Sequence, residues 1–281
     1  MSFNTVIATE QLAQHPEFRV FDCRHDLAAP QAGANAYAQG HIPGALHANM
    51  DTDLSSAKTG RNGRHPLPEL ATFVQWLGRC GVRPTDQIVT YDGGDGAFAA
   101  RLWWMLRAAG HEAVAVLDGG LAAWRAEGRP EATDVPGFAA SEYPARESTW
   151  PTSRRVTVDE VEHNLQSPAF TVIDARANNR YQGNGETIDP VGGHIPGALN
   201  RPFSQNTEAG RFKAPQALRA EFDALLADRA PTDIVHQCGS GVTACHNLLA
   251  MEVAGLSGSR LYAGSWSEWC SDPSRPVATG A

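Results

Sequence analysis

Short apolar runs alternate with longer stretches of mixed polarity along the chain. The runs at 20–21, 88–89 and 114–117 are bounded by turn residues, which is typical of buried parallel strands. The stretches at 70–77 and 99–106 between them have the pattern of helices. This alternation predicts an α/β sheet with helices on both faces. Sheets of this kind bind ligands at the carboxyl ends of their strands.

The same pattern occurs twice. Four segments of the first half have counterparts in the second half, in the same order. The matching pairs are 19–24 with 171–176, 40–46 with 193–199, 86–92 with 232–238, and 119–124 with 264–269. The second of these pairs is identical in every letter, Gly-His-Ile-Pro-Gly-Ala-Leu. Ordered matches of this kind indicate two homologous domains in tandem.

The repeat also predicts where the domains begin and end. We expect a first domain at residues 1–130 and a second domain at residues 155–281. The residues between them, 131–154, are rich in Pro, Ser, Thr and Glu, which favours an ordered or semi-extended linker. A chain of 281 residues is long enough for each domain to bury a core of its own.

Charge and cysteine content narrow the functional classes. The net charge of −8 argues against a surface that binds nucleic acid or an anionic membrane. No apolar run approaches the length of a membrane span, and the first 14 residues lack the basic and apolar regions of a signal peptide. The five cysteines are scattered, at 23, 80, 238, 245 and 270, and do not form a disulfide framework. We therefore expect a protein of the reducing cytoplasm.

One loop of the second domain combines a thiol with a curled backbone. Cys238 follows the apolar pair 234–235, and helix-compatible sequence continues from Thr243 to Met251. We call residues 238–243, Cys-Gly-Ser-Gly-Val-Thr, the Cys238 loop. Its glycines allow consecutive amides to point at one anionic centre. Hydrogen bonds to a charged group contribute about 1.5–3 kcal/mol and a helix terminus only about 0.3–1 kcal/mol, so the amides are expected to stabilise a thiolate more than the helix does.

The repeat serves as an internal control for this interpretation. The position of Cys238 is occupied in the first half by Asp92, which has no thiol chemistry and is predicted to form a turn at the end of a strand. His41 and His194 both occur in His-Ile-Pro-Gly, although only the second half has a cysteine at the strand end. A residue that the two halves share in this way is expected to have a structural role, with its ring holding a turn.

These residues together resemble the tandem-domain rhodanese-type sulfurtransferases over essentially the whole chain. The likeness rests on the duplicated His-Ile-Pro-Gly-Ala, on 118–124 and 265–269, and on the Cys238 loop, whose neutral Gly-Ser sequence is similar to that of the 3-mercaptopyruvate sulfurtransferases. The resemblance implies an α/β fold of two tandem rhodanese-like domains, each a mainly parallel sheet flanked by helices. The first domain is then non-catalytic, because Asp92 stands in place of the cysteine, and the second is catalytic.

The resemblance also implies a ping-pong reaction that needs no cofactor. Cys238 would take a sulfur from 3-mercaptopyruvate and form a persulfide, from which cyanide, a small thiol or a thioredoxin-like protein removes the sulfur. Ser240 and His41 would form a proton relay beside the thiol. The remaining residues of the loop would hold the substrate: Gly239, Gly241, Val242 and Thr243.

An arginine is expected to bind the donor carboxylate, because a guanidinium matches a carboxylate with two hydrogen bonds. Arg180 occupies the position of one substrate-binding arginine of the mercaptopyruvate enzymes. A second arginine normally follows in that family, but residues 183–190 contain no Arg or Lys here. Arg176 follows a strand-end Asp and has a counterpart in Arg24, so we interpret it as structural.

Several alternatives follow from the same residues. A cysteine phosphatase needs an arginine within its loop, and 243–245 are Thr, Ala and Cys, so we reject that class. A metal site at Cys238, Cys245 and His246 lacks a completing ligand pair, and Cys245 is expected to pack in the core. A thiosulfate:cyanide sulfurtransferase would use the same cysteine with another donor. A non-catalytic tandem binding module would form no persulfide.

Overall fold

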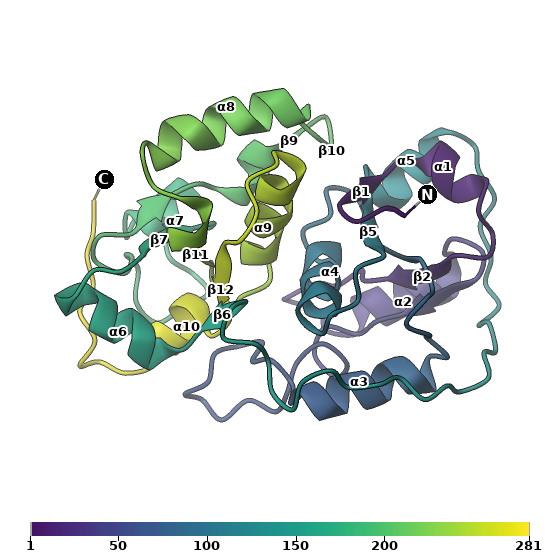
Figure 1. Cartoon of the computed structure of the whole chain (residues 1–281), viewed down its shortest axis with the longest axis horizontal. Coiled ribbons are helices and arrows are strands. Elements are labelled where there is room, and N and C mark those ends of the chain that lie inside the picture. The colour runs from purple at the N-terminus through teal and green to yellow at the C-terminus, as the bar shows by residue number, and fades with distance from the viewer. Residues whose placement is uncertain (1, 281) are drawn as a thin grey trace. The chain divides into compact units, whose positions relative to one another are not determined.

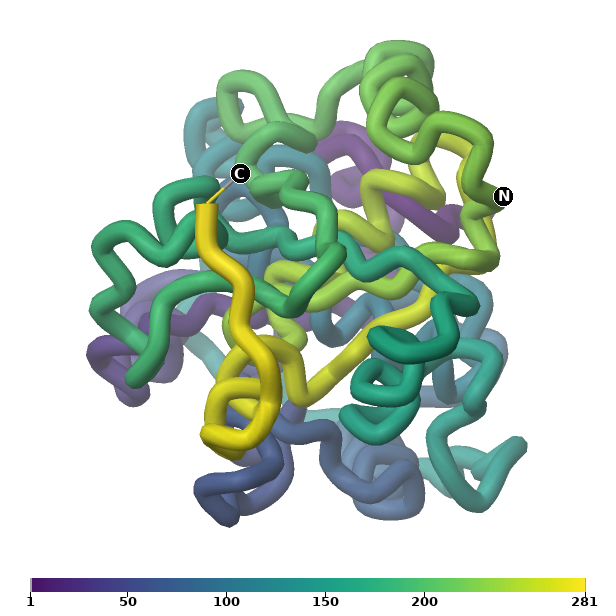
Figure 2. Tube along the Cα trace, turned by 90° about the vertical axis from the view of Figure 1, so that its left-hand side faces the viewer, coloured from purple at the N-terminus to yellow at the C-terminus, as the bar shows by residue number. Residues whose placement is uncertain are grey.

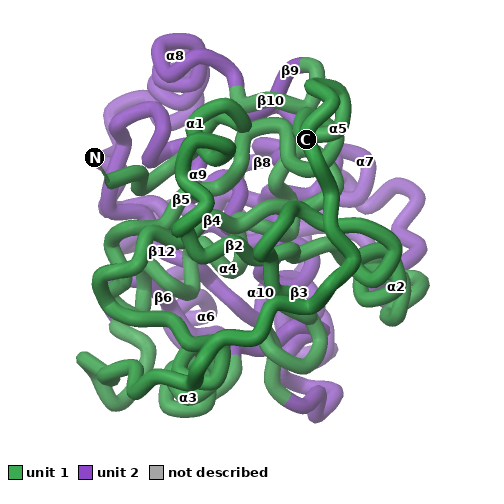
Figure 3. The backbone as a smooth tube through the Cα atoms, turned by 90° about the vertical axis from the view of Figure 1, so that its right-hand side faces the viewer, with its two compact units in different colours: residues 1–56, 68–151, 209–212 green, residues 57–67, 152–208, 213–281 purple. Residues whose placement is uncertain are grey.

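The computed structural model describes residues 2–280. The chain forms two compact units, coloured separately in Figure 3. Unit 1 comprises residues 1–56, 68–151 and 209–212, and unit 2 comprises 57–67, 152–208 and 213–281. Each unit therefore includes a short segment from the other half of the sequence.

Unit 1 is built around a five-stranded sheet. The strands lie in the order β1-β5-β4-β2-β3, and every neighbouring pair is parallel. Three of them, β1, β5 and β2, are labelled in Figure 1. They are β1 (Val6–Ile7), β2 (Arg19–Asp22), β3 (Ala45–His47), β4 (Ile88–Tyr91) and β5 (Val114–Leu117). The connecting helices are α1 (Thr9–Ala13), α2 (Ala32–Gln39), α3 (Leu70–Arg79), α4 (Ala99–Ala108) and α5 (Gly120–Ala126).

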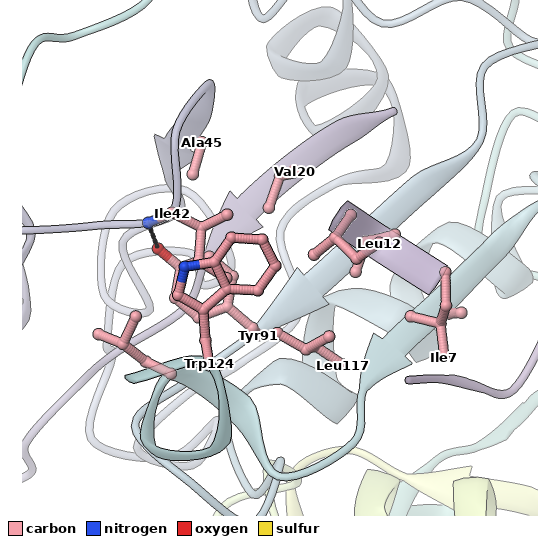
Figure 4. Packing of buried hydrophobic residues seen from close by; sticks show 11 residues of the cluster. Ile7, Leu12, Val20, Ile42, Ala45, Tyr91, Leu117 and Trp124 are labelled. Atoms are coloured by element: carbon pink, nitrogen blue, oxygen red, sulfur yellow. Dashed lines mark hydrogen bonds between the residues drawn. The ribbon is translucent and has the colours of Figure 1, made fainter. Parts of the chain in front are cut away.

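Helices cover both faces of this sheet because successive strand residues point to opposite sides. Tyr91 of β4 packs in a cluster with Trp124 of α5 and Leu12 of α1, and its hydroxyl accepts a hydrogen bond from the Ile42 amide (3.1 Å; Figure 4). The preceding residue, Thr90, points the other way, and its hydroxyl donates to the first carbonyl of α4. The carboxyl end of β4 is thereby fixed between two helical layers.

Unit 2 repeats this architecture, and the path of its residues 152–208 and 213–280 can be followed from teal to yellow in Figure 2. Its strands lie in the order β6-β12-β11-β7-β8, again with every neighbouring pair parallel. They are β6 (Arg155–Val156), β7 (Thr171–Asp174), β8 (Leu199–Asn200), β11 (Ile234–Gln237) and β12 (Arg260–Tyr262). The α-helices are α6 (Val158–Gln166), α7 (Asn178–Tyr181), α8 (Pro215–Leu226), α9 (Ala244–Val253) and α10 (Ser265–Trp269). The predicted duplication and the predicted α/β class are both confirmed.

The central strand of unit 2 is again enclosed on both sides. Val235 of β11 packs in a buried cluster with Val161 of α6 and with Trp266 and Trp269 of α10. His236 points the other way, and its Nε2 lies 3.0 Å from the sulfur of Met251 on α9.

The remaining described elements are short. They are two 3-10 helices (Phe203–Asn206 and Pro231–Asp233) and the strands β9 (Thr207–Glu208) and β10 (Arg211–Phe212).

The boundaries of the units differ from those predicted for the domains. Residues 131–151, expected as a linker, belong to unit 1 and pack on it without forming a helix or strand. The indole of Trp150 lies against the rings of Trp104 (5.9 Å between centroids) and Phe73 (5.6 Å), and its N–H donates to the carbonyl of Pro68. Burial of these rings explains why the segment stays with the first domain. Over residues 2–280, no helix is long and apolar enough to cross a membrane.

Candidate active site

The Cys238 loop begins where the buried strand β11 ends. Cys238 is 2 % exposed, its amide donates to the Ser265 hydroxyl (3.1 Å), and its carbonyl accepts from the Trp266 amide (3.0 Å). Gly241 turns the backbone with φ +74°, and a Cβ there would lie 2.2 Å from the carbonyl oxygen of Ala263. Only glycine satisfies both conditions, so the curl of the loop depends on this residue.

The amides of the Cys238 loop lack protein acceptors at several positions. Within residues 2–280, the backbone N–H groups of Gly239, Ser240, Val242 and Thr243 have no hydrogen-bond acceptor in the chain. Buried amides are normally paired, and a curl of free N–H groups before a helix is a site for an anion. The loop is therefore preorganised to receive negative charge beside the thiol.

The equivalent loop of unit 1 has an anion of its own. One oxygen of the Asp92 carboxylate accepts from the amides of Gly94 and Gly96 (both 3.0 Å), and the other accepts from Phe98 (2.8 Å) and Ala99 (3.2 Å). Burial raises the pKa of Asp92, and these amide contacts oppose the shift. The prediction that Asp92 forms a turn at the strand end is confirmed.

A histidine that the sequence analysis missed contacts the hydroxyl of the Cys238 loop. Nδ1 of His65 lies 2.8 Å from Oγ of Ser240, and both side chains are buried. His65 belongs to segment 57–67, which is part of unit 2 although it lies in the first half of the sequence. The segment is outside the matched repeat regions, so no pattern in the sequence pointed to it.

His41 has a structural environment within unit 1, and its place in the relay stays a prediction. Its Nδ1 lies 2.8 Å from the carbonyl oxygen of Tyr37 and its Nε2 lies 3.0 Å from that of Asp134, so both ring nitrogens are engaged within unit 1. The ring also stacks on Tyr37 at 3.9 Å. His194 repeats this arrangement with Tyr181, at 2.8 Å to its carbonyl and 3.7 Å between rings. Both histidines hold turns, as their duplication indicated.

Two arginines reach the Cys238 loop. A Cβ built on Gly239 would lie 2.7 Å from Nη2 of Arg64 and 3.7 Å from Nη2 of Arg180. Arg180, on α7, was predicted from the sequence, whereas Arg64 comes from segment 57–67 and was not. Arg64 supplies a second cation even though 183–190 contains none.

Two acids anchor these guanidiniums. The Asp189 carboxylate contacts Nη1 of Arg64 through one oxygen and Nη2 of Arg180 through the other, the latter at 3.0 Å. Nε of Arg180 donates to Glu186 at 2.9 and 3.1 Å. Burial raises the pKa of Asp189, an effect that the charge of Arg64 opposes. The two arginines are thus fixed in place by ion pairs.

Arg176 has the structural role that its repetition indicated. Its guanidinium forms a bidentate ion pair with Asp174 (2.6–3.1 Å) and donates to the carbonyl of Gly193 at 2.6 Å. Arg24 and Asp22 form the same pair in unit 1. Cys245 is fully buried on α9 with its sulfur 3.4 Å from the Gly241 carbonyl oxygen, which fits a packing role.

The comparisons with known proteins agree with this geometry. The rhodanese-like domain family matches the chain twice, at residues 7–127 and 157–272. The chain is 44% identical, over the full length of both proteins, to the probable 3-mercaptopyruvate sulfurtransferase of Pseudomonas aeruginosa. It is 35% identical to bovine thiosulfate sulfurtransferase, covering 95% of this chain and 92% of that one.

Solved structures give the same result. The 3-mercaptopyruvate sulfurtransferase from Leishmania major superposes with a TM-score of 0.83 at 30% identity, covering 95% of this chain and 74% of that one. A crystal structure of a 3-mercaptopyruvate sulfotransferase from Escherichia coli gives a TM-score of 0.80 at 31% identity, covering 94% of this chain and 99% of that one. Similarity of this extent, with a thiol in an open cradle of amides, leads to one assignment. The chain belongs to the rhodanese-like domain family and is a sulfurtransferase with two such domains.

Proposed function

We propose that the protein moves a sulfur atom from 3-mercaptopyruvate to a thiophilic acceptor through a persulfide on Cys238. The observation that supports this donor is the pair of guanidiniums, Arg64 and Arg180, beside a loop that carries no charged side chain of its own. Such a site offers directed hydrogen bonds to a planar carboxylate on one side and free amides on the other.

In the first half-reaction the Cys238 thiolate attacks the sulfur of the donor. A sulfur–sulfur bond forms, the carbon–sulfur bond of the donor breaks, and its electron pair passes to the enolate of pyruvate. The enolate takes a proton and leaves as pyruvate. Ser240 of the Cys238 loop lies in hydrogen-bond contact with His65, so these two side chains can pass this proton. We propose His65, in place of His41, as the histidine of the relay.

The loop residues would hold the transferred sulfur. Free amides of Gly239, Ser240, Val242 and Thr243 can donate to an anionic persulfide as they would to the thiolate, with Gly241 supplying the curl. In the second half-reaction an acceptor attacks the outer sulfur, the sulfur–sulfur bond breaks, and its electron pair returns to Cys238 as a thiolate. Cyanide, a small thiol and a thioredoxin-like protein thiol all have the required nucleophile.

Thiosulfate is the second candidate donor. It is favoured by the likeness to bovine thiosulfate sulfurtransferase, and the terminal nitrogens of Arg64 and Arg180 can also donate hydrogen bonds to its oxygens. A non-catalytic binding module is a further alternative. It fits the Asp92 loop of unit 1 but gives no reason for a thiol in an open cradle in unit 2.

The deciding experiment compares kcat/KM for 3-mercaptopyruvate and for thiosulfate, with cyanide as the acceptor. Intact mass is recorded after each donor alone, and Cys238→Ser is the blank. We expect a preference for 3-mercaptopyruvate and the addition of one sulfur to the wild type only. A preference for thiosulfate would reassign the donor, and the absence of sulfur transfer from both would favour the binding module.

We also propose that the protein works in a reducing cytoplasm, where a protein thiol is available as acceptor. All five cysteines are free in the structure, in keeping with such a compartment. Turnover with a reduced thioredoxin-like protein in place of cyanide would test this acceptor, and failure to release the sulfur from the persulfide would exclude it.

A further inference from the structure

Asp189 is a buried acid that joins the two arginines of the site. Its side chain is 2 % exposed, whereas those of Arg64 and Arg180 are 25 % and 19 % exposed. Each carboxylate oxygen contacts a terminal nitrogen of a different guanidinium. One rigid, short side chain therefore sets the spacing of two long, flexible ones.

The turn that carries Asp189 is itself fixed. One oxygen of Glu186 accepts hydrogen bonds from the amides of Thr187 (3.1 Å), Ile188 (2.9 Å) and Asp189 (3.1 Å). The same side chain holds Nε of Arg180. The acid at 186 thus ties the backbone of the turn to one guanidinium, and the acid at 189 ties that guanidinium to the other.

The contacts of the acids decide which donors of the arginines remain available. In Arg180, Nε binds Glu186 and Nη2 binds Asp189, and Nη1 lies 3.8 Å from a Cβ built on Gly239. In Arg64, Nη1 binds Asp189, and Nη2 lies 2.7 Å from the same point. One terminal nitrogen of each arginine is therefore left facing the Cys238 loop.

The formal charge of this cluster is balanced. Arg64 and Arg180 contribute two positive charges, and Glu186 and Asp189 contribute two negative charges. Arg176 also lies 3.7 Å from Glu186, but its charge is matched by its own partner, Asp174. A balanced cluster keeps its directed hydrogen bonds but gives little net attraction for a second negative charge on the ligand. The balance of charge therefore lowers the affinity for a monoanionic carboxylate only slightly, whereas it lowers the affinity for a dianion more.

We propose that Asp189 is a positioning and specificity-determining residue, which aligns Arg64 and Arg180 for a donor carboxylate and disfavours dianionic donors. This inference rests on the proposed function, since it assumes that the donor anion is bound by these arginines. Asp189 acts through the guanidiniums and does not itself contact the donor.

The test is Asp189→Asn, which keeps the size of the side chain and removes its charge. We expect kcat/KM for 3-mercaptopyruvate to fall about tenfold, through KM, because one of the two anchoring contacts is lost. We expect kcat/KM for thiosulfate to stay level or to rise, because the cluster gains a net positive charge. The ratio of the two donors should shift at least tenfold towards thiosulfate. An equal loss for both donors, or no change for either, would overturn the proposal.

Two further variants keep the result interpretable. Asp223→Asn removes the same charge from an exposed ion pair with Arg219 on α8, and it should leave the donor ratio within twofold of the wild type. Asp189→Glu retains the charge and should restore a ratio nearer to that of the wild type than Asp189→Asn does. A ratio in Asp189→Glu equal to that in Asp189→Asn would mean that charge is not the cause.

A binding measurement separates failure of this inference from failure of the proposed function. Pyruvate and sulfate are titrated into Cys238→Ser with and without Asp189→Asn, so that no sulfur transfer is needed. Loss of the acid should weaken the binding of pyruvate and strengthen the binding of sulfate. Unchanged affinity for both anions would reject the role of Asp189 even if 3-mercaptopyruvate proves to be the donor. The expected change would support it even if turnover is absent.

Discussion

The two units share a scaffold and differ at the end of one strand. Both have the same order of five parallel strands, the same bidentate Asp–Arg pair, and the same histidine held by a backbone carbonyl. In unit 1 the strand ends in Asp92, whose carboxylate accepts hydrogen bonds from its own loop. In unit 2 the strand is followed by Cys238, and the amides of Gly239, Ser240, Val242 and Thr243 lack acceptors in the described chain. One cradle contains its own anion and the other is open to an external one.

The units also differ in the segments that they receive from the other half of the sequence. Unit 2 includes 57–67, which brings Arg64 and His65 to the Cys238 loop. Unit 1 includes 209–212, in which Arg211 contacts Glu127 and the carbonyl of Asp118. The difference in chemistry between the repeats therefore has two sources, the residue at the strand end and the segment placed beside it.

Replacing Cys238 with the residue of the other repeat should have the largest effect. In Cys238→Asp the nucleophile is lost and a carboxylate can accept the loop amides as Asp92 does. We expect sulfur transfer to fall by at least about 10³-fold with any donor, measured as kcat/KM, and no sulfur to be added in the intact mass. Cys270→Ser is the control and should keep its activity. Residual transfer in Cys238→Asp above the buffer rate would reject Cys238 as the nucleophile.

A pair of histidine variants tests the assignment of the relay. We expect His65→Gln to lower kcat by about 10²-fold, because His65 contacts Ser240, and to change the pH profile of kcat. His41→Gln should reduce stability, because it breaks contacts with the carbonyls of Tyr37 and Asp134, and should leave kcat of the folded protein within about twofold. The assignment fails if His41→Gln lowers kcat as much as His65→Gln does.

Arg64, which the comparison of the two repeats missed, should matter as much for activity as Arg180, which the sequence predicted. We expect Arg64→Ala and Arg180→Ala each to lose about 2 kcal/mol of transition-state stabilisation with 3-mercaptopyruvate, measured from kcat/KM. Arg219→Ala, on the exposed face of α8, serves as the control. If Arg64→Ala has no effect, the second cation of the site lies elsewhere. Equal losses with thiosulfate would show that the arginines do not distinguish the carboxylate donor.

The last expected effect concerns stability in acid and not activity. Burial lowers the pKa of His236 to about 3, whereas a histidine in the unfolded chain has a pKa of about 6.5. Below about pH 6.5 the unfolded chain binds a proton that the folded chain does not, so this residue destabilises the fold as the pH falls. By pH 4.5 the loss is about 3 kcal/mol, because two pH units at about 1.4 kcal/mol each separate that pH from the pKa of the unfolded histidine.

Exchanging His236 for its counterpart in the other repeat checks this value. Thr90 occupies the equivalent position in β4 and does not titrate. Urea unfolding of wild type and His236→Thr at pH 7 and pH 4.5 should show a smaller loss of stability on acidification in the variant. An identical loss in both proteins would mean that protonation of His236 does not cause the loss of stability between pH 7 and pH 4.5.

The features that could be predicted from sequence were local or duplicated. The strand, the glycine loop and Cys238 lie within a few residues of each other, and the repeat identified His41, His194 and Arg176 as shared structural positions. In contrast, the contact between His65 and Ser240 joins residues 175 positions apart. No periodicity carries such a pairing, because it depends on the path of an irregular segment through the folded chain.

The predicted linker shows a related limit. Its composition of Pro, Ser, Thr and Glu matched that of a connecting segment, but it also contains Tyr143 and Trp150, which are both buried. The hydroxyl of Tyr143 lies 2.9 Å from a ring nitrogen of His111. Aromatic residues in a polar segment were the available signal, since a free linker has no reason to carry them.

The segment 57–67 has a consequence for how the gene can change. The first repeat has no nucleophile of its own, yet it encodes the histidine and one arginine of the site in unit 2. Deleting the first repeat would remove the side chains of Arg64 and His65 together with the inactive domain. A shortened gene that keeps only the copy with the cysteine would therefore encode the Cys238 loop without the two side chains that lie against it.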